Sequence, residues 1–320
     1  MLQGIFQTLK HRFGQKLRAN RNAFGRKSLK FLLSKLEHMT LRLSILPRQK
    51  SDHSLERRIE RHYHDLQLNA SDYYGNLLAT LKHSTEQQLH SLLRLLLPWL
   101  GKVQTKRGQP LPVEVHGFGS FGSPFYMLST NTLVVPLSLL GPPLYSPGQS
   151  ELLSYSSLGF ILGHELSHGF TPDAVRIDSR GRAQIGIGLE VLRNRRFRDE
   201  ATCLRFRFGA EQLEEKFADA NGLDLAYSAY FDAAEGDRRW DENSIEPGQT
   251  STLRQQHFFL NFAQFFCSDE DSSQDNDDHG TDRRRVNDAV ANFEPFQQAF
   301  NCSKSWFEKR YRQRTQCRLY

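Results

Sequence analysis

The residues best suited to chemistry lie in one short segment, GHELSH at 163–168, which contains the pattern H-E-x-x-H. Residues four apart share a face of a helix, so His164 and His168 can direct imidazole nitrogens at one metal ion. Glu165 would then flank the water that such a metal holds. Catalytic zinc takes three protein ligands and keeps its fourth position open, so the pattern requires a further ligand elsewhere in the chain.

That ligand is available in the segment EKFAD at 215–219, where Glu215 and Asp219 would share a helix face. Glu215 could complete a His₂Glu set. Asp219 could accept a hydrogen bond from the far ring nitrogen of a ligating histidine and fix its tautomer. The alternative is a surface helix with scattered charges, which accounts for the residue types but not for their order after H-E-x-x-H.

The elements that must position these residues are mostly helical. Apolar residues at three- and four-residue spacing predict two or three packed helices within 5–45 and 52–97, and only 125–127 and 132–135 look like strands. The acidic stretch 268–278 cannot bury itself and is expected to be a solvated loop. Further helices are expected at 151–169, about 208–230, 251–266, 286–300 and 303–313.

Length and composition indicate a globular protein. The chain has 320 residues, of which 38% are apolar and 24% charged, enough for one large domain or two ordinary ones. The longest apolar stretches, 92–100 and 133–144, are interrupted by Arg, Pro or Gly. Both are shorter than the roughly 18 residues of a membrane-spanning helix, so we expect no transmembrane segment.

Positive charge is concentrated near the N-terminus. Residues 1–50 carry twelve Lys and Arg and one acid, Glu37, which is a net charge of +11. Because the whole chain has a net charge of +6, the other 270 residues carry 6 − 11 = −5. A basic surface shared by the whole fold is therefore not indicated, and we expect no nucleic-acid partner. Residues 1–35 lack the apolar core of a secretory signal. They are compatible with a mitochondrial transit peptide or, more simply, with a basic helix packed on the domain.

Seven sequence blocks, in order along the chain, resemble the neprilysin and endothelin-converting-enzyme family of zinc metallopeptidases. The resemblance implies a mainly α, α+β fold: a thermolysin-like (gluzincin) catalytic domain at 111–320, with a small sheet and flanking helices. Residues 1–110 would be a helical remnant of the family's helical lobe. The blocks are TNTLVVPLSLLGPPLY (130–145), GHELSHGF (163–170), EEKFADANGLDLAYSAY (214–230), QQHFFLNFAQFFC (255–267), HGTDRRRV (279–286), NFEPFQQAFNC (292–302) and CRLY (317–320).

The resemblance implies a zinc-dependent endopeptidase that acts on peptides. One Zn²⁺ per chain would be held by His164, His168 and Glu215. Glu165 would be the general base that deprotonates the zinc-bound water and passes the proton to the leaving amine. Asp219 would orient His164.

Substrate contacts follow from the same resemblance. His279 would hydrogen-bond the tetrahedral intermediate, and Arg285 would anchor a substrate carbonyl. An apolar pocket would favour cleavage on the amino side of hydrophobic residues, although such residues would equally suit an ordinary core. Its lining would be Leu139, Leu144, Phe160, Ile161, Phe265 and Phe266.

Two departures from the family pattern favour a different class of function, a catalytically weak or inactive peptidase-like binding or decoy protein. The family's Asn-Ala, which docks substrate backbone as an added strand, is here Ser123-Pro124, and proline has no N–H to donate. The family's Asp after His-Gly-Phe is here Thr171, so His168 would lack a carboxylate partner unless Asp173 reaches it.

The four cysteines allow three disulfide pairings, and none has the close spacing of a structural zinc site. The resemblance implies a Cys203–Cys317 disulfide if the chain is exported, with Cys267 and Cys302 unpaired or bonded to one another. It also implies the extracellular side of a membrane, although no export signal is visible in this sequence.

Overall fold

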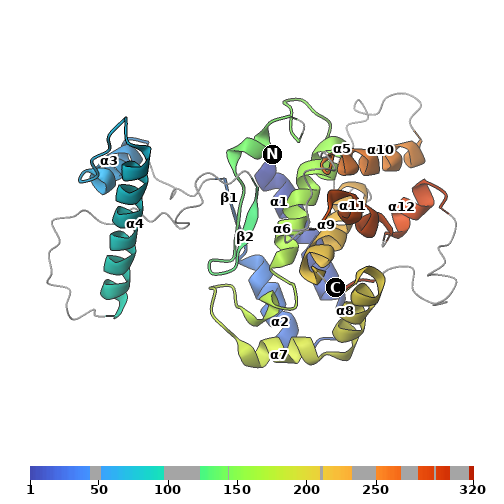
Figure 1. Ribbon diagram of the computed structural model, residues 1–320. Helices are drawn as coiled ribbons and strands as arrows, with labels where there is room; N and C mark the ends of the chain where they lie inside the picture. The colour runs from blue at the N-terminus through green and yellow to red at the C-terminus, as the bar shows by residue number, and fades with distance from the viewer. Residues whose placement is uncertain are drawn as a thin grey trace. The chain divides into compact units, whose positions relative to one another are not determined.

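The computed structural model describes residues 1–43, 52–96, 123–142, 144–209, 212–232, 250–267, 280–291, 293–302 and 317–320 (Figure 1). Its contacts divide the chain into two compact units, one of Met1–Leu43 with Gly122–Tyr320 and the other of Ser44–Phe121. This division differs from the predicted boundary at residue 110. The N-terminal helices belong with the helices that carry the predicted metal ligands because their apolar faces are buried in the same core.

The centre of the larger unit is a pair of buried helices, α6 (Phe160–His168) and α9 (Leu213–Phe231). Residues 160–167 of α6 are all buried. The N-terminal helices α1 (Leu2–Ala19) and α2 (Arg26–Glu37) belong to this unit, and α1 contacts both α6 and α9. Figure 1 shows α1 beside α6. The predicted ligand residues therefore lie on helices that pack against other elements on several sides.

The helix predicted over 151–169 is continuous but changes its winding. It begins as α5 (Glu151–Ser154), where the Ser150 side chain accepts a hydrogen bond from the backbone N–H of Leu153. A π turn, Tyr155–Gly159, then leads into α6. Such turns are often found at functional sites because they shift the angular position of the residues that follow.

A small sheet flanks the central helices, with strand order β1-β3-β2. β2 (Phe125–Met127) pairs antiparallel with β3 (Thr132–Val134), which confirms the predicted strand pair. β1 (Thr40–Arg42) pairs parallel with β3 and was not predicted, because three residues after a helix carry no strand pattern of their own. Within the described sheet, β2 is an edge strand.

Of the remaining helices of the larger unit, the one at 251–264 was predicted, whereas the two within 185–208 were not. The segment expected as one helix at 286–300 is two, separated near Phe293, with Pro295 in the first turn of the second. The segments 268–278 and 303–313 lie outside the described residues. Short 3₁₀ turns lie at Leu137–Leu140 (η2) and Ala174–Arg176 (η4), and the helices are α7 (Ile185–Arg193), α8 (Arg195–Phe208), α10 (Ser251–Gln264), α11 (Asp282–Ala291) and α12 (Glu294–Ala299).

The smaller unit contains α3 (Asp52–Tyr63) and α4 (Tyr73–Leu96). Both fall in the region expected to be helical. None of the helices in the described part of the chain is both long and apolar enough to cross a membrane.

The predicted disulfide is confirmed. Cys203, on α8, is bonded to Cys317, and their Cα atoms are 5.7 Å apart. The bond fixes the C-terminal residues, where Tyr320 donates a hydrogen bond of 2.9 Å to the backbone oxygen of Phe170, just after α6. Cys267 and Cys302 are unpaired and exposed.

A fully buried lysine joins α2 to the loop that follows α6. Lys35 has no exposed surface, and its ammonium donates to the backbone oxygen of Ala174 at 2.7 Å. The ammonium also lies 6.0 Å from the ring centres of Tyr126 and Phe170. Burial lowers the pKa of Lys35 to about 7, against a smaller opposing effect of Asp178.

We expect Lys35→Met to remove a pH dependence of stability. The folded-state pKa lies below that of the unfolded chain, about 10.4, so between pH 7 and 10 the unfolded state binds more protons. The free energy of unfolding of the parent should therefore rise with pH across this window, by at most about 1.4 kcal/mol per pH unit from this group. Urea unfolding at pH 7 and pH 9 measures it. If the free energy of unfolding rose equally with pH in parent and variant, Lys35 would be charged in the folded protein.

Candidate metal centre

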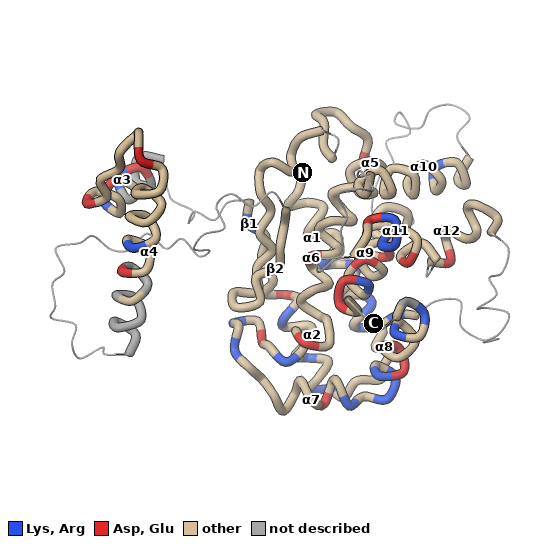
Figure 2. The backbone as a smooth tube through the Cα atoms, in the orientation of Figure 1, with Lys and Arg blue, Asp and Glu red and all other residues tan. Residues whose placement is uncertain are grey.

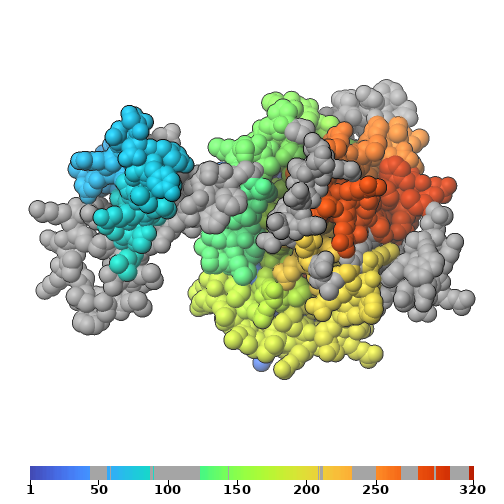
Figure 3. Space-filling view, in the orientation of Figure 1, coloured from blue at the N-terminus to red at the C-terminus, as the bar shows by residue number. Residues whose placement is uncertain are grey.

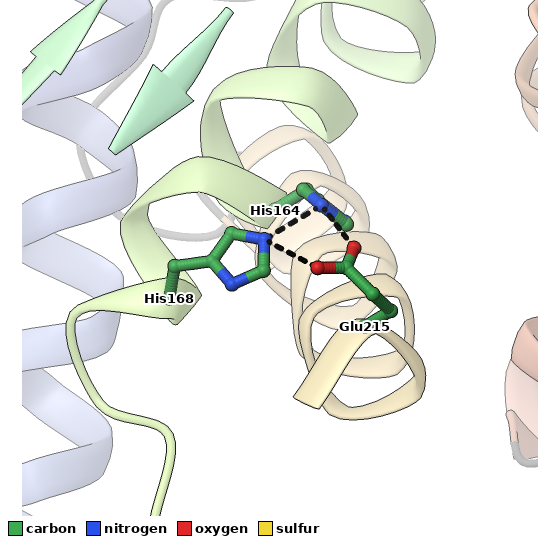
Figure 4. A group of neighbouring side chains, drawn as sticks. All are labelled: His164, His168 and Glu215. Atoms are coloured by element: carbon green, nitrogen blue, oxygen red, sulfur yellow. Dashed lines mark hydrogen bonds and ion pairs between the residues drawn. The ribbon is translucent and has the colours of Figure 1, made fainter. Parts of the chain in front are cut away.

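Three side chains from α6 and α9 converge on one point (Figure 4). His164 and His168 are one turn apart on α6, and Glu215 lies in the first turn of α9. Each offers one ligand atom, and these atoms all lie within 4.8 Å of one another. The convergence is the arrangement expected from the spacing of the histidines and from the position of Glu215 in its helix.

The separations of these atoms fit one zinc ion. The two Nε2 atoms are 3.0 Å apart, His164 Nε2 is 3.3 Å from Glu215 Oε2, and His168 Nε2 is 3.5 Å from Glu215 Oε1. Tetrahedral zinc with bonds of about 2.0–2.1 Å places neighbouring ligand atoms roughly 3.3–3.4 Å apart. Two imidazoles and one carboxylate are also the donor set of many catalytic zinc sites. The three residues therefore fit zinc in both spacing and chemistry.

Next to the candidate ligands, His164, Asp219 and Arg285 form a series of charged hydrogen bonds. Asp219 Oδ1 accepts a hydrogen bond of 2.8 Å from Nδ1 of His164, which leaves Nε2 of a neutral imidazole with its lone pair toward the other ligands. Arg285 donates to both oxygens of the same carboxylate, at 2.8 and 2.9 Å. Burial favours the neutral acid, but the hydrogen bonds from Arg285 and His164 prevail and hold the pKa of Asp219 well below its usual value.

The surrounding carboxylates favour a positive charge at His164. Burial opposes protonation of this ring, yet its hydrogen bonds to Asp219 and Glu215 raise its pKa to about 10. Glu165 adds to the same effect by its charge. A buried site that stabilises a cation so strongly is suited to hold a metal ion in place of a proton.

Two glycines allow α6 and α9 to approach closely. A Cβ atom on Gly222 would lie 2.7 Å from the backbone nitrogen of His164, and a Cβ on Gly163 would lie 2.9 Å from the backbone oxygen of Gly222. Beside this contact, Asn221 donates to Ser167 Oγ at 2.7 Å, and Ser167 donates to the oxygen of Gly163 at 2.6 Å. This contact was not predicted from the sequence. The only sign of it there is a glycine in each helix near the candidate site residues.

We expect Gly222→Ala to weaken zinc binding. The added methyl group would press on the backbone of His164, so the helices must separate and carry Glu215 away from the histidines. Overpacking of this kind typically costs about 1–3 kcal/mol of stability. Zinc titration and thermal unfolding of the variant measure both effects.

Gly4→Ala provides the control, because a Cβ at Gly4 of α1 meets nothing within 4 Å. It should bind zinc as the parent does and gain a few tenths of a kcal/mol or more from helix propensity. A Gly222→Ala protein with parental zinc affinity would show that the helix contact does not set the ligand geometry.

The proposed general base is close to the ligands but is not one of them. Glu165 follows His164 on α6 and is 7% exposed. Its charge acts on His164. A carboxylate in this place can accept a proton from a water molecule held near the histidines.

The residues predicted to line the substrate pocket comprise an aromatic cluster and three aliphatic side chains. Phe160, Phe265 and Phe266 form one aromatic cluster, with ring centres 4.9–6.2 Å apart. Arg285 lies over the Phe266 ring at 5.0 Å, so this cluster adjoins the Arg285–Asp219 pair. Leu139, Leu144 and Ile161 belong to the same buried or partly buried core.

The other residues expected to bind substrate or to support the ligand histidines lie in different places. Ser123 is exposed and precedes the edge strand β2, while His279 lies outside the described residues. The carboxylate of Asp173 pairs with Arg176. Thr171 is buried, and its hydroxyl donates to the backbone oxygen of His168 at 3.4 Å. Glu214 accepts a hydrogen bond of 3.1 Å from the backbone N–H of Asp173. The loop after α6 is therefore tied to α9 through Glu214.

Comparisons with known proteins agree with this site. The model of peptidase family M13 matches residues 123–318. Neprilysin of Mus musculus is 27% identical over 271 residues, which cover 79% of this chain and 34% of that protein. Endothelin-converting enzyme-like 1 of Homo sapiens is 31% identical over 198 residues, 56% of this chain and 24% of that protein. The chain thus spans about a third of the length of the neprilysins it matches.

Solved structures share the fold. The zinc metalloprotease ZMP1 of Mycobacterium tuberculosis, in complex with an inhibitor, has a TM-score of 0.67 at 20% identity and covers 94% of this chain and 44% of its own. PepO of Lactobacillus rhamnosis HN001 has a TM-score of 0.64 at 21% identity, with 95% and 44% covered. The predicted mainly helical α+β fold with a small sheet is confirmed.

Proposed function

The chain belongs to peptidase family M13, and on this premise we propose that it is a zinc-dependent endopeptidase that hydrolyses peptides on the amino side of hydrophobic residues. The observation that carries the proposal is the ligand triangle of His164, His168 and Glu215, with separations of 3.0–3.5 Å. An ordinary surface helix would not bring these three side chains together, with His164 buried and His168 and Glu215 half-buried.

The chain's own residues supply the remaining chemistry. Zinc, when bound, would act as a Lewis acid and make a water molecule more acidic. Glu165 would accept the proton of the attacking water and later deliver it to the leaving amine. Asp219, held ionised by Arg285, would keep His164 in the tautomer that exposes Nε2.

Substrate binding would use the edge of the sheet and the aromatic cluster. β2 is an edge strand of the described sheet, so an extended peptide could add beside it as a further strand. Pro124 removes one N–H from this edge. The cluster of Phe160, Phe265 and Phe266 supports a preference for a hydrophobic residue after the scissile bond.

Arg285 would act in two ways at once. Its Nε and one terminal nitrogen bind Asp219, but a guanidinium has five N–H donors, so others remain to meet a substrate carbonyl. The role in substrate anchoring and the role in orienting His164 are therefore compatible.

Metal content and peptide cleavage test the proposal together. The purified chain should contain about one zinc per molecule and should cleave a peptide with an internal Phe or Leu. A chelator should stop cleavage, and added zinc should restore it. Zinc binding without cleavage of any peptide in a mixed-sequence library would instead support the binding or decoy function that Ser123-Pro124 favours.

A further inference from the structure

The N-terminal helices carry a run of exposed cations at the point where they join. Residues 18–30, from the end of α1 to the middle of α2, contain no acid. Their basic side chains are all exposed, and they are Arg18, Arg21, Arg26, Lys27 and Lys30.

A second set of cations lies on α7 and α8. Residues 190–205 contribute five exposed arginines against two exposed acids, Glu190 and Asp199. On α8, residues 195, 198, 202 and 205 share one face, which extends about 15 Å along the helix axis. Figure 2 shows Lys and Arg positions along α7 and α8. The arginines are Arg193, Arg195, Arg196, Arg198 and Arg205.

The two segments that carry these cations lie against each other although they are far apart in the sequence. Arg196 donates to the backbone oxygen of Arg21 at 2.8 Å, and Asn194 donates to that of Asn22 at 3.0 Å. Figure 3 shows the yellow segment with α7 and α8 as a continuous part of the molecular surface. We call these ten cations the basic face. The sequence analysis did not anticipate it, because the cations are divided between two segments.

A hollow of about 410 Å³ opens where the two segments meet. It is lined by residues of both, among them Gly25, Ser28, Glu190 and Arg193. The N-terminus of α2, with its free backbone N–H groups, begins at Gly25 and has no side-chain cap. Ser28, which lines the hollow, lies in the first turn of α2 and is 2% exposed. The hollow thus has donors suited to a small anionic group.

From the basic face and this hollow we propose a docking surface for a sulfated polysaccharide. Arginine forks bind sulfate and phosphate oxyanions with paired hydrogen bonds, and clustered cations attract a linear polyanion. The partner is a polysaccharide rather than a nucleic acid because α8 itself carries the Cys203–Cys317 disulfide. Disulfides persist in oxidising compartments, where sulfated glycans are the abundant polyanions.

Heparin is the probe, and it is tested on the 320-residue chain. It should bind in low salt and elute at a defined NaCl concentration, since exposed charges are screened by salt. Arg195→Glu with Arg198→Glu should lower the affinity about tenfold or more. The matched control, Arg57→Glu with Arg61→Glu on exposed positions of α3 in the other unit, makes the same change of charge and should bind as the parent does.

Two single variants locate the anion in the hollow. Glu190→Gln removes the carboxylate that lines it and should tighten heparin binding, whereas Ser28→Ala should weaken it several-fold. Peptide hydrolysis and thermal unfolding should be unchanged in both.

Three results would overturn the proposal. Equal losses in the α3 control would mean that net charge alone attracts heparin. Equal binding by the Arg195/Arg198 variant and the parent would exclude the basic face. DNA or anionic phospholipid vesicles that compete as well as heparin at equal charge would exclude a sulfated polysaccharide as the preferred partner.

Discussion

Glu165→Gln is expected to lower peptide hydrolysis by about 10²–10⁴ while zinc remains bound, because it removes proton transfer and leaves the ligands intact. Glutamine has the shape of glutamate but cannot accept a proton at neutral pH. Glu165 is not among the three ligand residues, so the metal site should keep its composition. The turnover rate and the zinc content per chain, measured on the same sample, check both parts.

Glu165→Asp serves as the companion variant. It keeps a carboxylate but withdraws it from the histidines by one methylene, so its rate should lie between those of the parent and Glu165→Gln. A Glu165→Gln protein that cleaves peptide at the parental rate would show that another group accepts the proton. A loss of zinc in this variant would mean that Glu165 supports the metal directly.

Glu215→Ala is expected to remove zinc and activity together. The change leaves two histidines as ligands and deletes a negative charge next to them, so both coordination and charge balance are lost. The parent should gain thermal stability on addition of zinc, because a ligand that binds only the folded state stabilises it. The variant should gain little over the same zinc range.

The adjacent acid provides the control for this prediction. Glu214→Gln keeps a side chain that can accept from the backbone N–H of Asp173, and its carboxylate is not among the ligand atoms. It should keep zinc and most of the activity. Full zinc occupancy in Glu215→Ala would instead assign the third ligand to a neighbouring acid, with Glu214 the first to test.

The local sequence was sufficient to predict the candidate site residues and the helices that carry them. Helical geometry fixes which residues share a face, so the spacing indicated His164 and His168 as a candidate ligand pair and Glu215 as a possible third ligand. The hairpin of β2 and β3 was also predictable, because antiparallel strands joined by a short turn are neighbours in the sequence. Family resemblance added the Cys203–Cys317 pair and indicated His164 as the histidine that Asp219 orients.

Tertiary structure alone decided how the two helices meet and what surrounds them. The contact of Gly163 with Gly222 and the binding of Arg285 to Asp219 join residues more than fifty positions apart. Strand β1 and buried Lys35 belong to the same class, because their partners lie about a hundred residues or more away. No local pattern encodes such contacts, since each depends on the path of the chain between the partners. The basic face has the same origin: its charges are visible in the sequence, but only folding places the two segments side by side.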